Sequence, residues 1–191
     1  MPAAPPHVLR AVDEEVARRF TEGPLYHVTY HGRLPSIAEE GLTTGQARSI
    51  GGPAYDEHVR GRLFLTEPEG VSFWMHRAEN HAEANSDDPF GDGYVPVALR
   101  VSPDCFENAE LERDEHGTRD ALVDAWMVSG EPFGPECLEV YTGSRWAPVE
   151  EYGEIDPESA FNTESNPDYP DEDDKEFLRY FKYRSPLEPE L

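Results

Sequence analysis

The residues best suited to chemistry in this sequence are a histidine and a threonine on one short segment, and a glutamate far downstream. His27 and Thr29 lie two positions apart in a run that predicts a β-strand, so both side chains point to the same side. Glu139 lies in a second predicted strand, residues 138–141. An imidazole can hydrogen-bond a sugar hydroxyl, and a carboxylate can stabilise the cation that develops when the bond between a ribose and its base breaks. These residue types could therefore hold a polar ligand and stabilise a positive charge that develops on it.

The first of these segments, residues 25–29, is followed by one predicted helical segment, residues 34–38, and then by a glycine. This arrangement resembles the opening motif of the ADP-ribosyltransferase superfamily, whose first strand carries a His-x-Ser/Thr that holds NAD. The resemblance implies that His27 and Thr29 contact the ribose and the nicotinamide amide. Val28 stands where the family often has glycine, a mild departure because only the backbone of that residue is needed.

A second motif runs from Gly61 through a short predicted strand into a helix that carries Phe73 and Trp74. It resembles the family's strand-then-helix segment, in which an aromatic ring stacks on nicotinamide. When Gly61 is aligned, Trp74 falls where the poly-ADP-ribose-polymerase version has a tyrosine, and Phe73 is an adjacent candidate. The family tyrosine itself is absent, and both rings also fit the simpler role of core aromatics on a helix.

The third motif is residues 136–141 followed by residues 145–148. It resembles the family's glutamate-bearing strand, which runs into a proline-containing edge segment. Glu139 matches the catalytic glutamate, whereas Glu136 lies three residues earlier and faces the opposite side. The sequence has 40 acidic residues, so a solvent-facing glutamate at a strand start is the alternative.

The three motifs occur in the family's order and span residues 25–148, about two thirds of the chain. The resemblance implies an α+β fold, an ADP-ribosyltransferase-like split antiparallel β-sandwich of two packed sheets with flanking helices. It also implies an enzyme that uses NAD and transfers ADP-ribose to a protein side chain, a nucleic-acid base or water. His27 and Glu139 would be its catalytic residues.

Three arginines near the expected pocket, Arg48, Arg60 and Arg62, are candidates for neutralising the pyrophosphate of NAD. Equally, these side chains can pair with neighbouring carboxylates. The sequence leaves both roles open.

The charge of the chain is strongly negative, with 40 acidic residues against 16 basic ones and a net charge of −24. Such a surface repels nucleic-acid phosphates over about 8 Å at physiological salt, which argues against general nucleic-acid binding. A solubilised surface with an acidic tail, a protein from a high-salt cytoplasm, and a surface that mimics nucleic acid or docks on a basic partner all remain open.

Cys105 and Cys137 form neither a metal-ligand spacing nor a disulfide framework, so we expect buried thiols. His76 and His81 are five positions apart on a predicted helix and diverge, so no metal is expected.

Domain boundaries follow from composition: an N-terminal helix in residues 1–24, a folded domain in 25–149 and an acidic tail in 150–191. Within the tail, residues 175–184 are aromatic and basic and could dock back onto the acidic body. The remaining expected elements are a helix over 68–84, a strand over 94–101 with one buried face, a helix or strand over 118–128, and an edge strand over 145–148.

No signal peptide is visible, and no stretch approaches the roughly 18 apolar residues of a membrane span, so we expect a cytoplasmic protein without a membrane partner. Two other functions stay open. One is an RNA 2′-phosphotransferase-like enzyme, which shares the fold and uses NAD but needs a basic RNA-binding surface. The other is a non-catalytic acidic binding or inhibitor protein that mimics nucleic acid.

Overall fold

The computed structural model describes residues 23–44, 61–88, 92–106, 109–121, 123–129 and 133–154. Arg48, Arg60, nearly all of the expected N-terminal helix and residues 155–191 lie outside this part of the chain. The described strands are β1 (Leu25–Tyr30), β2 (Leu63–Thr66), β3 (Pro96–Val101), β4 (Glu110–Arg113), β5 (Ala125–Ser129), β6 (Leu138–Tyr141) and β7 (Trp146–Pro148). The described helices are α2 (Leu34–Glu40), α4 (Val71–Asn85) and α5 (Glu115–Ala121), with short 3-10 turns η1 (His31–Arg33), η2 (Pro68–Gly70), η3 (Pro103–Phe106), η4 (Pro135–Cys137) and η5 (Val149–Glu154).

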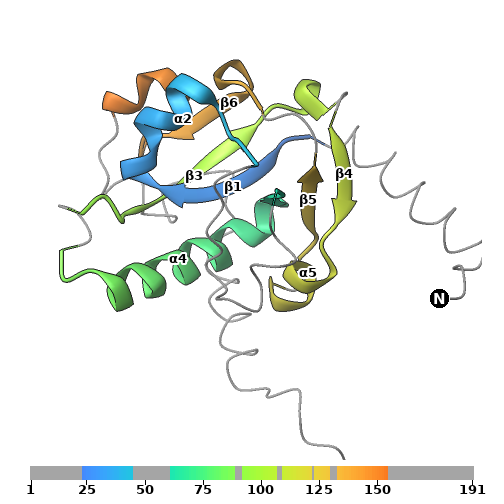
Figure 1. Cartoon of the computed structure of the whole chain (residues 1–191), viewed down its shortest axis with the longest axis horizontal. Coiled ribbons are helices and arrows are strands. Elements are labelled where there is room, and N and C mark those ends of the chain that lie inside the picture. The colour runs from blue at the N-terminus through green and yellow to red at the C-terminus, as the bar shows by residue number, and fades with distance from the viewer. Residues whose placement is uncertain are drawn as a thin grey trace, which may run out of the picture.

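The strands form one seven-stranded antiparallel sheet in the order β4-β5-β2-β1-β3-β6-β7 (Figure 1). β1 pairs with β3 over six residue pairs, but with β2 at a single pair, Tyr26 with Thr66. We call β1, β3, β6 and β7 the first half-sheet, β2, β5 and β4 the second half-sheet, and the β1–β2 boundary the seam. The α+β class is therefore confirmed. The expected two packed sheets are instead one sheet that is nearly divided at the seam.

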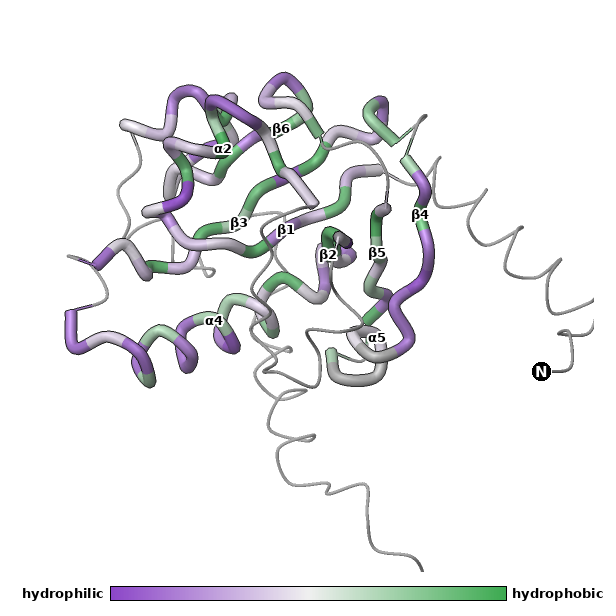
Figure 2. Tube along the Cα trace, viewed as in Figure 1, coloured by the Kyte–Doolittle hydropathy of each residue, from purple (hydrophilic) through white to green (hydrophobic). Residues whose placement is uncertain are grey.

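Helices cover both faces of the first half-sheet, and Figure 1 draws α2 and α4 on opposite sides of β1 and β3. On the α4 face, Tyr26 and Ala98 pack with residues of that helix. On the α2 face, Leu25 and Leu99 share a core cluster with Leu34 and other α2 residues. β3 is consequently buried on both faces, and the prediction of one buried face is wrong because α4 covers the other. Figure 2 draws β3 mostly in hydrophobic colours.

α4 begins after Pro68, as expected, because proline suits the first helical turn. Its buried residues recur at helical spacing and include two alanines, Ala78 and Ala82. These small side chains let the helix approach β1, where the Tyr30 hydroxyl donates a hydrogen bond of 3.0 Å to the carbonyl of Ala78. The opposite side of the helix is hydrophilic (Figure 2).

Gly41 ends α2 with a φ of 76°, and Leu42 then donates a backbone hydrogen bond of 2.9 Å to the carbonyl of Phe133. A side chain at Gly41 would collide with that same carbonyl. η5 packs against α2, and its first residue, Val149, is fully buried. Residues 150–154, assigned to the tail by composition, thus belong to the folded body.

The ambiguous segment 118–128 contains both alternatives, since α5 ends at Ala121 and β5 begins at Ala125. Polar α5 precedes a strand whose Trp126 is completely buried. The proline-containing segment near residue 148 forms β7, an edge strand of the sheet as expected.

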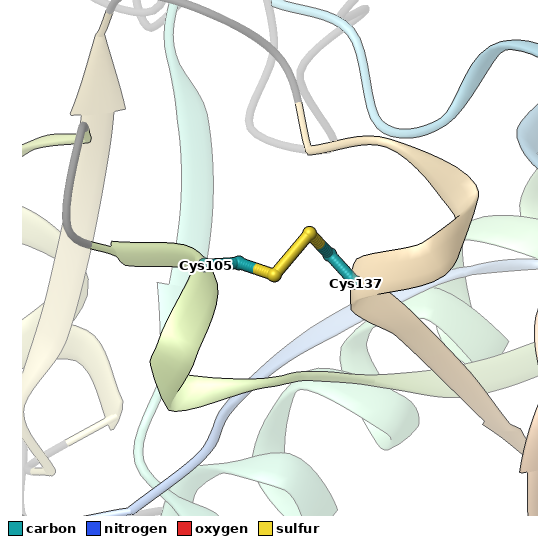
Figure 3. Close-up of a disulfide and its surroundings, with 2 residues drawn as sticks. All are labelled: Cys105 and Cys137. Atoms are coloured by element: carbon teal, nitrogen blue, oxygen red, sulfur yellow. A yellow bond between two sulfur atoms is a disulfide. The ribbon is translucent and has the colours of Figure 1, made fainter.

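Cys105 and Cys137 form a disulfide with Cα atoms 6.0 Å apart, so the prediction of free thiols is wrong (Figure 3). The reason is topological. β3 and β6 are neighbours, with Val101 paired to Leu138, so the turns that follow β3 and precede β6 meet. A separation of 32 residues in the sequence gives no indication of this proximity.

Candidate functional site

His27 lies at the seam and connects the two half-sheets. Its Nδ1–H donates a hydrogen bond of 2.8 Å to the carbonyl oxygen of Phe64 on β2. Only one backbone pair joins β1 to β2, so this side chain supplies a second link where the strands diverge. The side chain is partly buried.

The electrostatic environment keeps the His27 ring neutral. Burial lowers its pKa below the usual 6.5, the Phe64 hydrogen bond acts in the opposite direction, and the positive charge of Arg33 adds to the lowering. With Nδ1 donating, Nε2 carries the lone pair and is a hydrogen-bond acceptor. A neutral imidazole of this tautomer is suited to accept a hydrogen bond from a sugar hydroxyl.

Thr29 shares the face of His27. His27 is paired with Leu99 and Thr29 with Val97, and directly opposed residues of an antiparallel pair lie on the same face. Both partners belong to the core cluster on the α2 face. Thr29 is buried, with 7% of its surface exposed. The structure therefore brings together the two residues of the first motif.

Glu139 lies on the other face of the sheet. It is paired with Arg100, which is itself paired with Tyr26, a residue of the α4 cluster. Its Oε2 accepts hydrogen bonds of 2.9 Å from Nε and 2.8 Å from Nη2 of Arg100. That guanidinium also lies 4.7 Å from the ring centre of Trp146. Glu139 thus fixes an arginine on an aromatic ring, and the structure does not bring it to His27.

The two aromatic candidates of the second motif also lie away from the His27 face. α4 packs on the opposite face through other residues, while Phe73 and Trp74 are partly exposed on its flanks. Their rings contact each other edge to face at 5.0 Å, and Arg77 lies 5.8 Å from the Trp74 ring. Because α4 packs on the face of the sheet opposite His27 and Thr29, neither ring lies beside that pair.

Arg62 precedes β2 and interacts within the second half-sheet. Its Nη1 lies 3.3 Å from the sulfur of Met127 and 3.5 Å from a carboxylate oxygen of Glu112. Met127 and Glu112 are cross-strand partners, so Arg62 pairs with a neighbouring carboxylate. Of the two roles that the sequence left open, this arrangement matches the ion pair.

A carboxylate that the sequence motifs did not single out bonds a tryptophan of the core cluster that also contains Leu25 of β1 and Leu99 of β3. Glu67 follows β2, and its Oε1 accepts a hydrogen bond of 3.0 Å from the indole N–H of Trp126. Trp126 is paired with Leu65 and shares its core cluster with Leu25. In the sequence, Glu67 only marks the end of a predicted strand. Its hydrogen-bond partner is a buried tryptophan fifty-nine positions away, which the local sequence does not indicate.

A second overlooked pair lies at the same end of the second half-sheet. Arg113 Nη2 donates to Asp124 Oδ1 at 2.7 Å, and the carbonyl of Asp124 accepts the backbone N–H of Glu67 at 3.1 Å.

Within the described residues, no group of three histidine, cysteine or acidic side chains is arranged to hold a metal ion. No helix in the same part of the chain is long and apolar enough to cross a membrane. Comparison of the chain with protein-family models, curated proteins and solved structures gives no match.

Proposed function

We propose that this chain is an ADP-ribosyltransferase-like protein that binds NAD at the seam through His27 and Thr29 and transfers ADP-ribose to an acceptor. The observation that carries the proposal is the neutral His27 ring, held by Phe64 so that Nε2 is left as an acceptor for a ribose hydroxyl. His27 and Thr29, the two residues of the motif that suggested NAD, share one face of β1.

The carboxylate for the glycosidic step is better assigned to Glu67 than to Glu139. Glu67 bonds a tryptophan of the cluster on the His27 face, whereas Glu139 pairs with Arg100 on the α4 face. In this assignment Glu67 stabilises the positive charge at the ribose as nicotinamide leaves. Trp146, Arg100 and Glu139 then serve the packing of the first half-sheet.

A cytoplasmic location and the absence of general nucleic-acid binding belong to the same proposal. The net charge of −24 supports the latter, because it disfavours approach of RNA or DNA. The acceptor is accordingly expected to be a protein side chain, a small molecule or water rather than a polynucleotide.

The test is NAD binding by calorimetry beside nicotinamide release by chromatography. We expect His27→Ala to weaken NAD binding about tenfold, the worth of one hydrogen bond. Glu67→Gln keeps an acceptor for the Trp126 indole, so it should bind NAD normally and lose nicotinamide release. Glu139→Gln is the matched carboxylate control and should leave both measurements unchanged.

Failure takes two forms. If Glu139→Gln alone abolishes release, the catalytic carboxylate is the one expected from the sequence motif. If the wild-type chain neither binds NAD nor releases nicotinamide, the transferase proposal is wrong and the acidic binding protein takes its place.

A further inference from the structure

The disulfide lies where the chain leaves the first half-sheet and returns to it. After β3 the chain forms β4, α5 and β5 in the second half-sheet and then re-enters the first half-sheet as β6. Cys105 stands just past the exit, in η3, and Cys137 just before the return, in η4 (Figure 3). A backbone hydrogen bond of 2.9 Å from Ser102 to the Cys137 carbonyl closes the same junction.

Residues 138–154, which follow Cys137, form a unit that has its own strand pairing and ion pair. β6 and β7 pair over three residue pairs, and Arg145 bonds Glu151 at 2.7 Å. We call these residues the C-terminal unit. It joins the rest of the protein through three β3–β6 pairs, the Arg100–Glu139 ion pair, the packing of η5 on α2 and the contact of Trp146 with Tyr26. Three of its apolar side chains are also buried in the core cluster that contains Leu34 and Leu99: Leu138, Val140 and Val149. Cys137, the residue directly before this unit, is linked covalently to Cys105 by the disulfide.

We propose that Cys105–Cys137 is a thiol–disulfide exchange site that controls the docking of the C-terminal unit on β3 and α2. While the disulfide is intact, Cys137 stays beside η3, so β6 re-forms its register whenever its pairs with β3 open. After reduction only the noncovalent contacts hold the unit, and its opening uncovers α2 and Leu99.

The chemistry needs a thiol reductant, either a dithiol or two monothiols. A thiolate attacks one sulfur, forms a mixed disulfide and releases the other cysteine as a thiolate. A second thiol then displaces the remaining cysteine, leaving two protein thiols and one oxidised reductant disulfide. Both cysteines are half-buried at the edge of the core cluster, and exchange requires that a small thiol reaches one of the sulfurs from this edge.

The charges beside the bond select among reductants. Asp104 precedes Cys105 and Glu136 precedes Cys137, and both acidic side chains are exposed. They repel every attacking thiolate, but they repel the thiolate of glutathione, with a net charge of about −2, more than that of dithiothreitol, with about −1. The double variant Asp104→Asn/Glu136→Gln should therefore speed reduction by glutathione roughly threefold and reduction by dithiothreitol by a smaller factor.

The test is hydrogen exchange on the folded wild-type protein before and after dithiothreitol. The chain has two cysteines, so the reductant has no other target. Loop closure over 32 residues predicts that amides exposed only by global unfolding exchange roughly 500-fold faster after reduction. Opening of the C-terminal unit predicts a further difference: after reduction, β6 amides should exchange at least about tenfold faster than β1 amides.

The variant Cys105→Ser/Cys137→Ser should exchange like the reduced protein and be insensitive to dithiothreitol. If β1 and β6 amides accelerate by the same factor, the disulfide only restrains the unfolded chain and the docking proposal is wrong. Two titratable thiols in the aerobically purified protein would also overturn it. NAD takes no part in these measurements, so their outcome is independent of the proposed function.

Discussion

The contacts that stabilise the first half-sheet differ from those that stabilise the second half-sheet. The first half-sheet has helices on both faces, and its central strands pair over six residues. In the second half-sheet, β5 pairs over four residues with each of its neighbours, β2 and β4, and α5 packs on β5. Across the seam, one register pair and the His27 side chain link the described strands β1 and β2, and the two half-sheets share the core cluster that contains Leu25 and Trp126. The difference places His27 at the least regular part of the sheet, where a single register pair joins β1 to β2 and a side chain supplies a further hydrogen bond.

The largest expected effect tests whether the first half-sheet dominates stability. Leu99→Ala removes a fully buried side chain between β1 and β6 and should cost about 3–5 kcal/mol. Leu111→Ala removes an equivalent side chain, 8% exposed, from the edge strand β4 and should cost about 2 kcal/mol. Urea unfolding monitored by tryptophan fluorescence measures both. Equal costs would contradict the proposed difference between the half-sheets.

The next effect tests the contact between α2 and the segment that returns to β6. Gly41 and Gly61 have nearly the same φ, 76° and 73°, but only Gly41 faces a neighbouring carbonyl, that of Phe133. Gly61→Ala should therefore cost about 1–2 kcal/mol from backbone strain alone, and Gly41→Ala about 3 kcal/mol or more. Thermal and urea unfolding of the two variants provide a matched comparison. If both alanines cost the same, the close approach of Gly41 to Phe133 does not constrain the fold.

Sequence patterns predict the helices and strands well, but they predict poorly which of these elements contact each other in the folded protein. β1, α2 and β6 follow from local hydrophobic spacing and from the glycine at position 41, and the structure has them. The disulfide and the Glu67–Trp126 bond depend on which strands become neighbours, which no local pattern encodes.

The candidate site divides in the same way. The side on which His27 and Thr29 point follows from strand alternation within one segment. The side of Glu139 depends on the register of β6 against β3, which pairs it with Arg100. Because a shift of one residue in register reverses every side chain, a motif match alone could not determine that side.

The smallest effect concerns the seam itself. Replacing His27 by asparagine should cost about 1 kcal/mol at neutral pH through the altered hydrogen bond to Phe64. Because burial lowers the pKa of folded His27 below 6.5, the unfolded chain binds a proton first as the pH falls. The wild-type protein should therefore lose stability below pH 6.5, by up to about 1.4 kcal/mol per pH unit until the folded pKa is reached.

His27→Asn removes this contribution, so the stability advantage of the wild type over the variant should shrink as the pH falls below 6.5 and reverse once the loss exceeds about 1 kcal/mol. Urea unfolding across that range measures it, and the difference between the two proteins cancels the titration of carboxylates common to both. Thr29→Val, on the same strand and face, is the matched control and should run parallel to the wild type. Parallel curves for His27→Asn and the wild type would mean that the imidazole titrates equally in folded and unfolded chains. Burial at the seam would then not favour the neutral ring, and the electrostatic support for Nε2 as the acceptor in the proposed NAD site would be lost.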